Sequence, residues 1–272
     1  MIIFNVFKKI AFLLIIATLF NCTSRSADKK VKNIELVEKK NERIISYSLL
    51  PAKNSNQVIE HKYYTLSYSE KDEQAEWVAY KLTNDNSNKK IKRKSYFRID
   101  PKVESGSSEL IDYYKSGYDR GHLAPAGSMR INDISMDESF YMSNISPQKP
   151  KFNQGIWKRL ENKVRIWSSR YDSLYVVTGP VLSRPIDVIG INNVTVPREF
   201  YKTIVGFNKN KIMSIAFIIP NDKSDESIYS YSVSIDEVEE ITGLDFYYNF
   251  KDSIENRMEA NNDIYTWLKI GN

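Results

Sequence analysis

Three apolar runs in the second half of the chain constrain its fold more than any other feature. They cover residues 174–181, 200–207 and 212–220, and Gly, Pro or Asn residues bound them. Short runs that are rich in Val, Ile and aromatic residues favour buried β-strands. Residues 76–82, with the sequence EWVAYKL, predict a further strand. The sequence therefore predicts a fold built on a buried β-sheet.

Helical patterns lie between and after these strands. Residues 153–169 have apolar side chains at the spacing of one helix face. These side chains are Ile156, Trp157, Leu160, Val164 and Trp167. Further on, Ser234 and Glu237 form a capping box that predicts a helix ending at Gly243. Because strands and helices are interspersed irregularly and no internal repeat is present, we expect one mixed α+β domain.

The N-terminal residues have the features of an export signal. Lys8 and Lys9 precede an apolar run, Ile10–Phe20, which is too short to span a membrane and suits the core of a signal peptide. The only cysteine, Cys22, follows this run, and the sequence LFNC resembles a bacterial lipoprotein box. In such a box Cys22 is lipidated and becomes the mature N-terminus, although Asn21 replaces the usual small residue. A plain signal peptide or a signal anchor with an incidental cysteine is the alternative.

This interpretation divides the chain into three segments. Residues 1–21 are the expected signal peptide, residues 22–56 a polar tether of mixed charge, and residues 57–272 the folded domain. The whole chain has a formal charge of +5, but residues 57–272 contain 29 basic and 30 acidic residues. The positive charge therefore belongs to the leader and the tether, and it does not by itself predict a nucleic-acid-binding domain.

The scarcity of cysteine and histidine restricts the metal chemistry. A single cysteine excludes a disulfide framework and a cysteine-based zinc site. Two histidines, His61 and His122, leave little room for a histidine-cluster centre. Any metal ion is therefore expected to have oxygen ligands. His61 lies outside every motif and is expected at the surface.

The stretch with the most chemical information runs from Tyr118 to Pro125 and has the sequence YDRGHLAP. His122 suits proton abstraction near neutral pH because the ordinary pKa of histidine is about 6.5. Arg120 offers a fork of donors that matches a phosphate group. On spacing alone, a surface turn that contains an ion pair is an equal alternative.

Two later motifs add context to this stretch. Residues 141–148 have the sequence YMSNISPQ, and residues 152–161 have the sequence FNQGIWKRLE. Together with DRGH, and in this order, they resemble the DNA/RNA non-specific endonuclease family, which includes the Serratia-type nucleases and mitochondrial endonuclease G. The resemblance covers roughly residues 60–250. It implies a ββα-metal fold within a larger antiparallel sheet flanked by helices, and Mg²⁺-dependent hydrolysis of phosphodiester bonds in DNA and RNA, with Mn²⁺ as a substitute.

The resemblance also implies roles for individual residues. His122 matches the general base that deprotonates the attacking water, and Arg120 matches the arginine that contacts phosphate. Asn153 matches the single protein ligand of the magnesium ion. Glu161 matches the acidic residue that holds metal-bound water, and Asn144 matches an asparagine that lines the site.

The spacing of Asn153 and Glu161 agrees with these two roles. In a regular helix, residues eight positions apart are separated by ~12 Å along the axis and ~80° around it. The two side chains are therefore not expected to ligate one ion directly, and Glu161 is expected to act through metal-bound water. Asp119, at the start of DRGH, is expected to support the site.

Each assignment has a structural alternative. His122 could be a hydrogen-bonded core residue, and Asn153 could cap the following helix, which does not exclude metal binding. Glu161 could face solvent and pair with Arg165, four residues later. Asn144 could simply stabilise a turn.

A basic run precedes the DRGH motif and could contact phosphate groups without reading sequence. It comprises Lys89, Lys90, Lys92, Arg93, Lys94 and Arg98. The resembled family has an additional active-site arginine in this region, and Arg93 and Arg98 are both candidates, with Arg93 slightly preferred. A solvated loop is the alternative.

These observations lead to the hypothesis of a sequence-non-specific, metal-dependent endonuclease that is exported and lipid-anchored in the periplasm or cell envelope. DNA and RNA are the expected substrates, and a homodimer is possible. One alternative is a catalytically silent nucleic-acid-binding lipoprotein, which would need no base or metal ligand. The other is a phosphodiesterase of small or lipid-linked substrates, which the basic run weakly disfavours.

Overall fold

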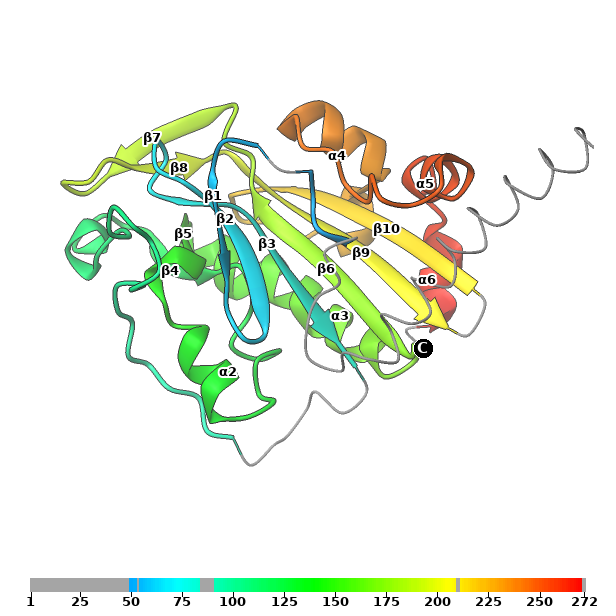
Figure 1. Cartoon of the computed structure of the whole chain (residues 1–272), viewed down its shortest axis with the longest axis horizontal. Helices are drawn as coiled ribbons and strands as arrows, with labels where there is room; N and C mark the ends of the chain where they lie inside the picture. Colours follow the sequence, from blue (N-terminus) through cyan, green and yellow to red (C-terminus); the bar gives the residue numbers. More distant parts are fainter. Residues whose placement is uncertain (1–48, 53, 84–90, 209–210, 271–272) are drawn as a thin grey trace, which may run out of the picture. The chain divides into compact units, whose positions relative to one another are not determined.

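The computed structural model describes residues 49–52, 54–83, 91–208 and 211–270. A seven-stranded antiparallel sheet organises them, with the strand order β1-β2-β3-β6-β9-β10-β11 (Figure 1). The strands are β1 (Gln57–Glu60), β2 (Tyr64–Ser69), β3 (Gln74–Leu82), β6 (Ser173–Pro180), β9 (Glu199–Asn208), β10 (Lys211–Pro220) and β11 (Ser232–Val233). The four predicted strands correspond to β3, β6, β9 and β10, which confirms the expected buried sheet.

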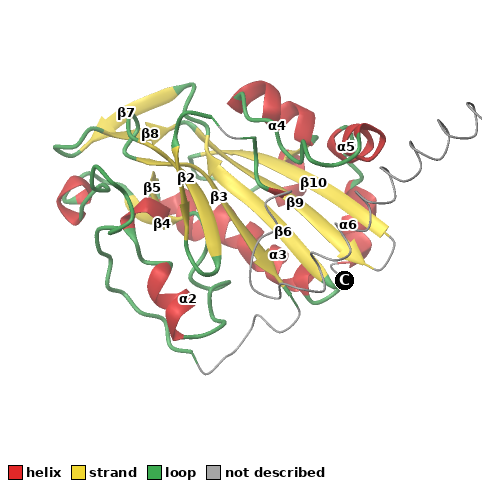
Figure 2. Cartoon of the chain, in the orientation of Figure 1, coloured by secondary structure: helices red, strands yellow, loops and turns green. Residues whose placement is uncertain are grey.

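Two small hairpins and several helices complete the α+β fold (Figure 2). The hairpins pair β4 (Asp119–His122) with β5 (Ile145–Gln148), and β7 (Pro185–Ile189) with β8 (Val194–Pro197). The α-helices are α2 (Asp133–Glu138), α3 (Lys158–Ser168), α4 (Ile235–Thr242), α5 (Asp252–Glu259) and α6 (Ile264–Ile270). A π-helix, η4 (Phe152–Trp157), precedes α3, and short 3₁₀ turns are η2 (Leu110–Tyr113), η3 (Met142–Asn144) and η5 (Ile228–Tyr231).

The capping box predicted for the helix near residue 240 is present in α4. Ser234 Oγ accepts a hydrogen bond from the Glu237 backbone N–H at 3.1 Å, and the Glu237 carboxylate accepts one from the Ser234 N–H at 2.7 Å. The helix ends at Gly243, whose φ of 71° lies in the left-handed region that glycine adopts easily. The prediction for this helix is therefore confirmed at both ends.

Alternate residues of β9 contact different layers, as the two-residue period of a strand requires. Phe200 packs on Trp157, the last residue of η4 before α3, with ring centroids 5.7 Å apart. Its neighbour Tyr201 packs on Phe246, in the segment between α4 and α5, at 5.8 Å. Helix α3 and the α4–α5 region therefore cover opposite faces of the sheet.

The segment that carries the sequence motifs is inserted between two neighbouring strands of the sheet. Strands β3 and β6 pair antiparallel, and Leu82 is the register partner of Leu174. The connection between them, residues 83–172, contains the β4–β5 hairpin, η4 and α3. The elements that carry the motifs therefore lie in one continuous insertion between these two strands.

The folded domain starts earlier than the sequence analysis placed it. Leu49 and Leu50 are buried, and the Ala52 N–H donates a hydrogen bond to the Asp245 carbonyl at 2.8 Å. Residues 49–52 are therefore packed within the domain, whereas we expected residues 22–56 to be a solvated tether. The apolar side chains at this end of the segment explain the difference, because they gain free energy on burial.

His61 is buried rather than at the surface, so that expectation is wrong. Its Nε2 lies 2.8 Å from Asp100 Oδ2, and its ring stacks on Tyr141 at 5.0 Å. The Ser143 hydroxyl donates a second hydrogen bond to the same Asp100 oxygen at 2.5 Å. Although burial raises the pKa of Asp100, these hydrogen bonds and the His61 charge lower it overall. His61 thus belongs to a buried polar pair with a structural role.

Several predictions concern residues outside the described part of the chain. These are the signal peptide at residues 1–21, the lipidated Cys22, the tether up to residue 48, and Lys89 and Lys90 of the basic run. Among the described helices, none is both long enough and apolar enough to cross a membrane.

Candidate active site

The DRGH motif forms strand β4, and β5 carries part of the second motif. His122 is the register partner of Ile145 across the hairpin. Gly121 allows a close approach to β5, because a Cβ at this position would lie 2.1 Å from the Gln148 side chain. Arg120 and His122 lie two positions apart in this strand, and both line one pocket.

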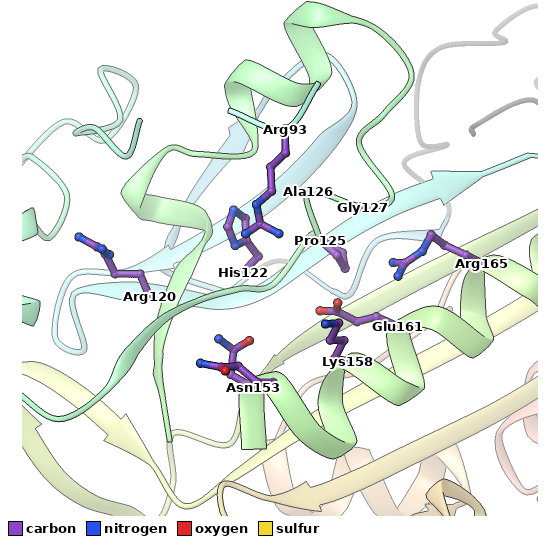
Figure 3. Close-up of a pocket in the computed structure, with 11 residues that line it drawn as sticks. Arg93, Arg120, His122, Pro125, Ala126, Gly127, Asn153, Lys158, Glu161 and Arg165 are labelled. Atoms are coloured by element: carbon purple, nitrogen blue, oxygen red, sulfur yellow. The ribbon is translucent and has the colours of Figure 1, made fainter. Parts of the chain in front are cut away.

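This pocket has a volume of about 320 Å³ and lies between the hairpin and α3 (Figure 3). The predicted site residues that line it are Arg93, Arg120, His122, Asn153 and Glu161. The structure therefore brings together side chains from a loop, a strand, a π-helix and an α-helix. Arg98 and Asn144, the other two predicted residues in the described part of the chain, do not line it.

The segment that carries Asn153 is not the regular helix that the spacing argument assumed. Residues Phe152–Trp157 form a π-helix, and Gly155 within it has non-helical angles, with φ −99° and ψ −111°. Because a π-helix has a wider turn than an α-helix, the separation predicted for Asn153 and Glu161 does not apply. Both side chains line the same pocket.

Asp119 fixes the orientation of Asn153. The Asn153 Nδ2 donates a hydrogen bond to Asp119 Oδ2 at 2.9 Å, and Gln154 Nε2 donates another to the same oxygen at 2.9 Å. A carboxylate can only accept, so the amide nitrogen of Asn153 must face Asp119. The Asn153 carbonyl oxygen is then free for the pocket, which suits an oxygen-preferring cation such as Mg²⁺.

His122 is held in a dry aromatic environment. Its ring lies 5.4 Å from the ring of Phe97 and 4.8 Å, edge to face, from that of Phe140. The buried Nε2 has no hydrogen-bond partner among the residues that the structure describes. Burial, assisted by the positive charge of Arg93, lowers the pKa of His122 to about 3. The imidazole is therefore neutral near pH 7, which is the form that a proton acceptor requires.

The pocket is strongly cationic although the domain is nearly neutral. Its charged lining comprises four cations, Arg93, Arg120, Lys158 and Arg165, and one carboxylate, Glu161. Arg93 and Arg120 lie over the aromatic rings of Phe140 and Phe97, at 5.8 and 4.7 Å from the ring centroids. Such an arrangement concentrates a polyanion at the pocket.

Of the two candidate arginines upstream of DRGH, the structure places Arg93 in the pocket and Arg98 elsewhere. Arg98 forms an ion pair with Asp137 at 2.5 Å, and its guanidinium lies 4.0 Å from the Tyr141 ring centroid. It also donates a hydrogen bond to the Asp137 carbonyl at 2.9 Å. These contacts engage Arg98 in fixing α2.

Asn144 supports the pocket wall and does not line the pocket. It is fully buried, its Oδ1 accepts the Ala124 N–H at 2.8 Å, and its Nδ2 donates to the Ala124 carbonyl at 3.0 Å. A further hydrogen bond reaches the Ser139 carbonyl at 2.8 Å. Because Ala124 follows His122 closely and precedes Pro125, Asn144 holds the backbone that shapes this side of the pocket.

A buried lysine that the sequence analysis did not select, Lys202, lies close enough to Glu161 for their charges to interact. Lys202 of β9 is fully buried, donates a hydrogen bond to Thr178 Oγ1 at 3.0 Å, and lies 4.5 Å from the Trp157 ring centroid. Burial lowers the pKa of Lys202 to about 7, against the opposing effect of the Glu161 charge. Burial likewise raises the pKa of Glu161, and the charge of Lys202 opposes this rise.

Arg165 does not form the ion pair with Glu161 that we considered, and instead donates hydrogen bonds to Asn162 and to Ser128 Oγ, the latter at 3.4 Å. A helical-face argument would have identified its place in the pocket, since Lys158, Glu161 and Arg165 recur at helical spacing. A comparable signal for Lys202 is the presence of a lysine within the otherwise apolar run 200–207.

Comparisons with known proteins agree with the geometry. The sequence profile of a family described as DNA/RNA non-specific endonuclease matches residues 42–253. Nuclease C1 of Cunninghamella echinulata var. echinulata is 37% identical over 206 residues, covering 70% of this chain and 82% of that protein. Mitochondrial endonuclease G of Homo sapiens is 33% identical over 198 residues, covering 67% of each protein. A crystal structure of an EndoG/EndoGI complex contains a chain with a TM-score of 0.69 and 35% identity, and the match covers 73% of this chain and 89% of that one.

Proposed function

Because the chain belongs to the DNA/RNA non-specific endonuclease family, we propose that this pocket hydrolyses phosphodiester bonds in both DNA and RNA without sequence preference. The observation that carries the proposal is the position of His122, which lines a cationic pocket and whose buried Nε2 has no hydrogen-bond partner among the described residues. A buried nitrogen without a partner is costly for a purely structural histidine. A role in proton transfer accounts for it.

The proposed reaction uses His122 as the general base. Its neutral ring takes a proton from water as the water oxygen forms a bond to phosphorus, and the bond from phosphorus to the leaving ester oxygen breaks. Packing against Phe97 and Phe140 buries the ring, and burial disfavours its charged form, so the ring is neutral before the reaction. Base catalysis by a positioned side chain contributes about 10²–10⁴-fold to the rate.

The cationic side chains are proposed to bind the substrate backbone. Arg93 reaches the pocket beside His122, and Lys158 and Arg165 approach it from α3 (Figure 3). Arg120 lies at the edge of the pocket, with its guanidinium turned away from these side chains and over the Phe97 ring. Contacts to phosphate groups position a nucleic acid without reading its bases. This distribution supports cleavage without sequence preference and is compatible with either sugar.

The donor set of the pocket fits a magnesium ion. Asn153, oriented by Asp119, is proposed as the direct ligand, and Glu161 is proposed to hold water at the ion. Mn²⁺ would be accepted by the same oxygen donors. When bound, the ion polarises the phosphoryl oxygen and stabilises negative charge on the leaving oxygen.

The first test is cleavage of supercoiled plasmid and of RNA by the folded domain. We expect cleavage in Mg²⁺ and none in EDTA. We expect the cleavage rate of His122→Ala to be at least ~100-fold lower than that of the wild type. Arg159→Ala is a suitable control, because Arg159 lies in α3 next to Lys158 but donates its hydrogen bond to the Ser224 carbonyl, outside the pocket. Circular dichroism would verify that each variant is folded.

Two outcomes would support the alternatives. A folded wild-type domain that binds DNA without cleaving it would be a silent binding protein. Faster turnover of a small chromogenic phosphodiester than of plasmid and RNA would indicate a phosphodiesterase of small substrates.

We further propose that Cys22 is lipidated and that the domain acts outside the cytoplasm. The support for this is the N-terminal sequence, with its charged start, apolar run and cysteine. Incorporation of a labelled fatty acid into the wild type, and its absence in Cys22→Ser, would be the expected result. Equal labelling of both proteins would rule the anchor out.

A further inference from the structure

A cluster of carboxylates lies outside the active-site pocket, where α4 and α5 lie near each other (Figure 1). Asp236 and Glu239 belong to α4, and Glu259 is the last residue of α5. One oxygen of each carboxylate lies within 4.8 Å of an oxygen of each of the other two. This spacing allows one cation to contact all three.

Glu259 is the member of the cluster that most needs a partner. It is only 7% exposed, and its buried Oε1 has no hydrogen-bond partner in the described part of the chain. A buried charged oxygen without a partner carries a large desolvation cost. Within the described part of the chain, none of the three carboxylates forms an ion pair with Lys, Arg or His.

Further carboxylates lie around the cluster. Asp245 and Glu255 are close enough to affect Glu259 electrostatically. Glu239 is held in place by the Phe246 N–H, which donates to its Oε1 at 2.7 Å. Among the described residues, this fixed carboxylate and the buried one therefore lie close together without an ion pair to a basic side chain.

We propose that Asp236, Glu239 and Glu259 form a second divalent-cation site, selective for Ca²⁺, that joins α4 to α5. Ca²⁺ accepts six to eight oxygen ligands in flexible geometry, whereas Mg²⁺ requires a near-ideal octahedron. Asp236 is exposed, so the ion can reach the cluster and complete its shell with water. The site is independent of the function proposed above, because it shares no residue with the active-site pocket.

The consequence of this site is structural. Helix α5 packs on β10, where the Ser214 hydroxyl donates to the Met258 carbonyl at 2.5 Å. Glu259 follows Met258 directly, so an ion there links the end of α5 to α4 on the same face of the sheet. Binding of Ca²⁺ is then expected to stabilise the C-terminal helices.

The test is thermal unfolding in EDTA and in 0.1–5 mM CaCl₂, with Asn153→Ala as the common background so that the active site does not contribute. At about ten times its Kd, Ca²⁺ should raise the Tm by ~3–6 °C. Glu259→Gln should abolish this shift while raising the Tm in EDTA, because it removes repulsion. Glu226→Gln, at an exposed position outside the cluster, should keep the full shift.

Direct binding gives a second measurement that does not depend on stability. Tb³⁺, a luminescent substitute for Ca²⁺, should be sensitised on excitation of tyrosine, since Tyr247 is close enough for the charges of Glu239 and Glu259 to affect its pKa. Glu259→Gln should lose this signal and Glu226→Gln should keep it. The proposal would be overturned if Ca²⁺ shifted the Tm of both variants equally. It would also be overturned if the Asn153→Ala protein showed neither a Tm shift in Ca²⁺ nor a Tb³⁺ signal. In that case a proton on Glu259 would be the compensating charge.

Discussion

The histidine of DRGH lines the pocket, whereas Asp119 of the same motif orients Asn153. Asp119 Oδ2 accepts hydrogen bonds from the side chains of Asn153 and Gln154, each at 2.9 Å. The bond to Asn153 determines which end of that amide faces the pocket. The four-residue motif therefore contains both an acid that orients Asn153 and the histidine that we propose as the base.

Replacing Asp119 by Ala should weaken metal binding rather than the proton transfer. The Asn153 amide would then be free to rotate, and loss of such an outer hydrogen bond typically costs 10- to 100-fold in metal affinity. We expect the Mg²⁺ concentration for half-maximal cleavage to rise by about that factor, with a near-normal rate at saturating Mg²⁺. Gln154→Ala removes the other bond to the same oxygen and should change the Mg²⁺ requirement little. Equal shifts in the two variants would contradict the assigned role.

The burial of His122 should make the stability of the domain depend on pH. Its pKa of about 3 in the folded state lies below the ordinary value of about 6.5, so the unfolded chain binds the proton more readily between these values. Stability from this residue is fully present above pH 6.5 and is lost as the pH falls, by about 3 kcal/mol at pH 4. Denaturant unfolding from pH 7 to pH 4 should therefore show a steeper loss for the wild type than for His122→Leu. Parallel curves would show that His122 is not desolvated.

At the scale of elements, α3 has two functional faces. Lys158, Glu161 and Arg165 line the pocket, while Trp167 and Leu160 are fully buried on the sheet side. Arg159 belongs to neither face and bonds to the Ser224 carbonyl at 2.9 Å. The helix therefore offers adjacent cations with different expected roles.

Lys158→Ala should weaken nucleic-acid binding more than Arg159→Ala does. Each phosphate contact contributes about one unit to the slope of log affinity against log salt concentration. We expect Lys158→Ala to lower this slope by about one, and Arg159→Ala to leave it unchanged, in binding titrations from 50 to 200 mM salt. If Arg159→Ala lowered the slope by as much, the substrate path would lie outside the pocket described here.

The sequence predicts some of these elements well for clear physical reasons. Strands β6, β9 and β10 are apolar runs that are buried on both faces, and Ser234 and Gly243 mark the ends of α4 by local hydrogen bonding and backbone preference. Strand β4 could not be predicted from pattern, because DRGH is short and polar. The π-helix could not be predicted either, because its apolar residues have ordinary helical spacing.

The site residues likewise include some that the sequence predicts and some that only the tertiary structure identifies. His122, Arg120, Asn153 and Glu161 lie in motifs, and the structure brings them to one pocket. The choice between Arg93 and Arg98 depends on the path of a loop, for which spacing gives no information. The burial of His61 depends on Asp100, thirty-nine positions away, and only the tertiary structure brings the two together.

For the molecule as a whole, residues 49–52 belong to the folded domain. A chain beginning at residue 57 should therefore unfold at a lower temperature than one beginning at residue 47. Two buried leucines contribute about 1.5–3 kcal/mol each, so we expect the Tm to fall by at least ~5 °C. Calorimetry on the two chains would measure the difference. Identical melting curves would mean that Leu49 and Leu50 add no stability.

The insertion of the catalytic segment between β3 and β6 has an evolutionary consequence. The segment leaves and re-enters the sheet at paired positions, Leu82 and Leu174, so its chemistry can diverge without changing strand order. Yet Trp157 and Trp167, within that segment, also cover one face of the sheet. A descendant that lost nuclease activity would thus be free to lose the polar half of α3, while selection for folding preserved the apolar half. Relatives that have lost nuclease activity should therefore show substitutions in the polar half of α3 and keep its apolar half.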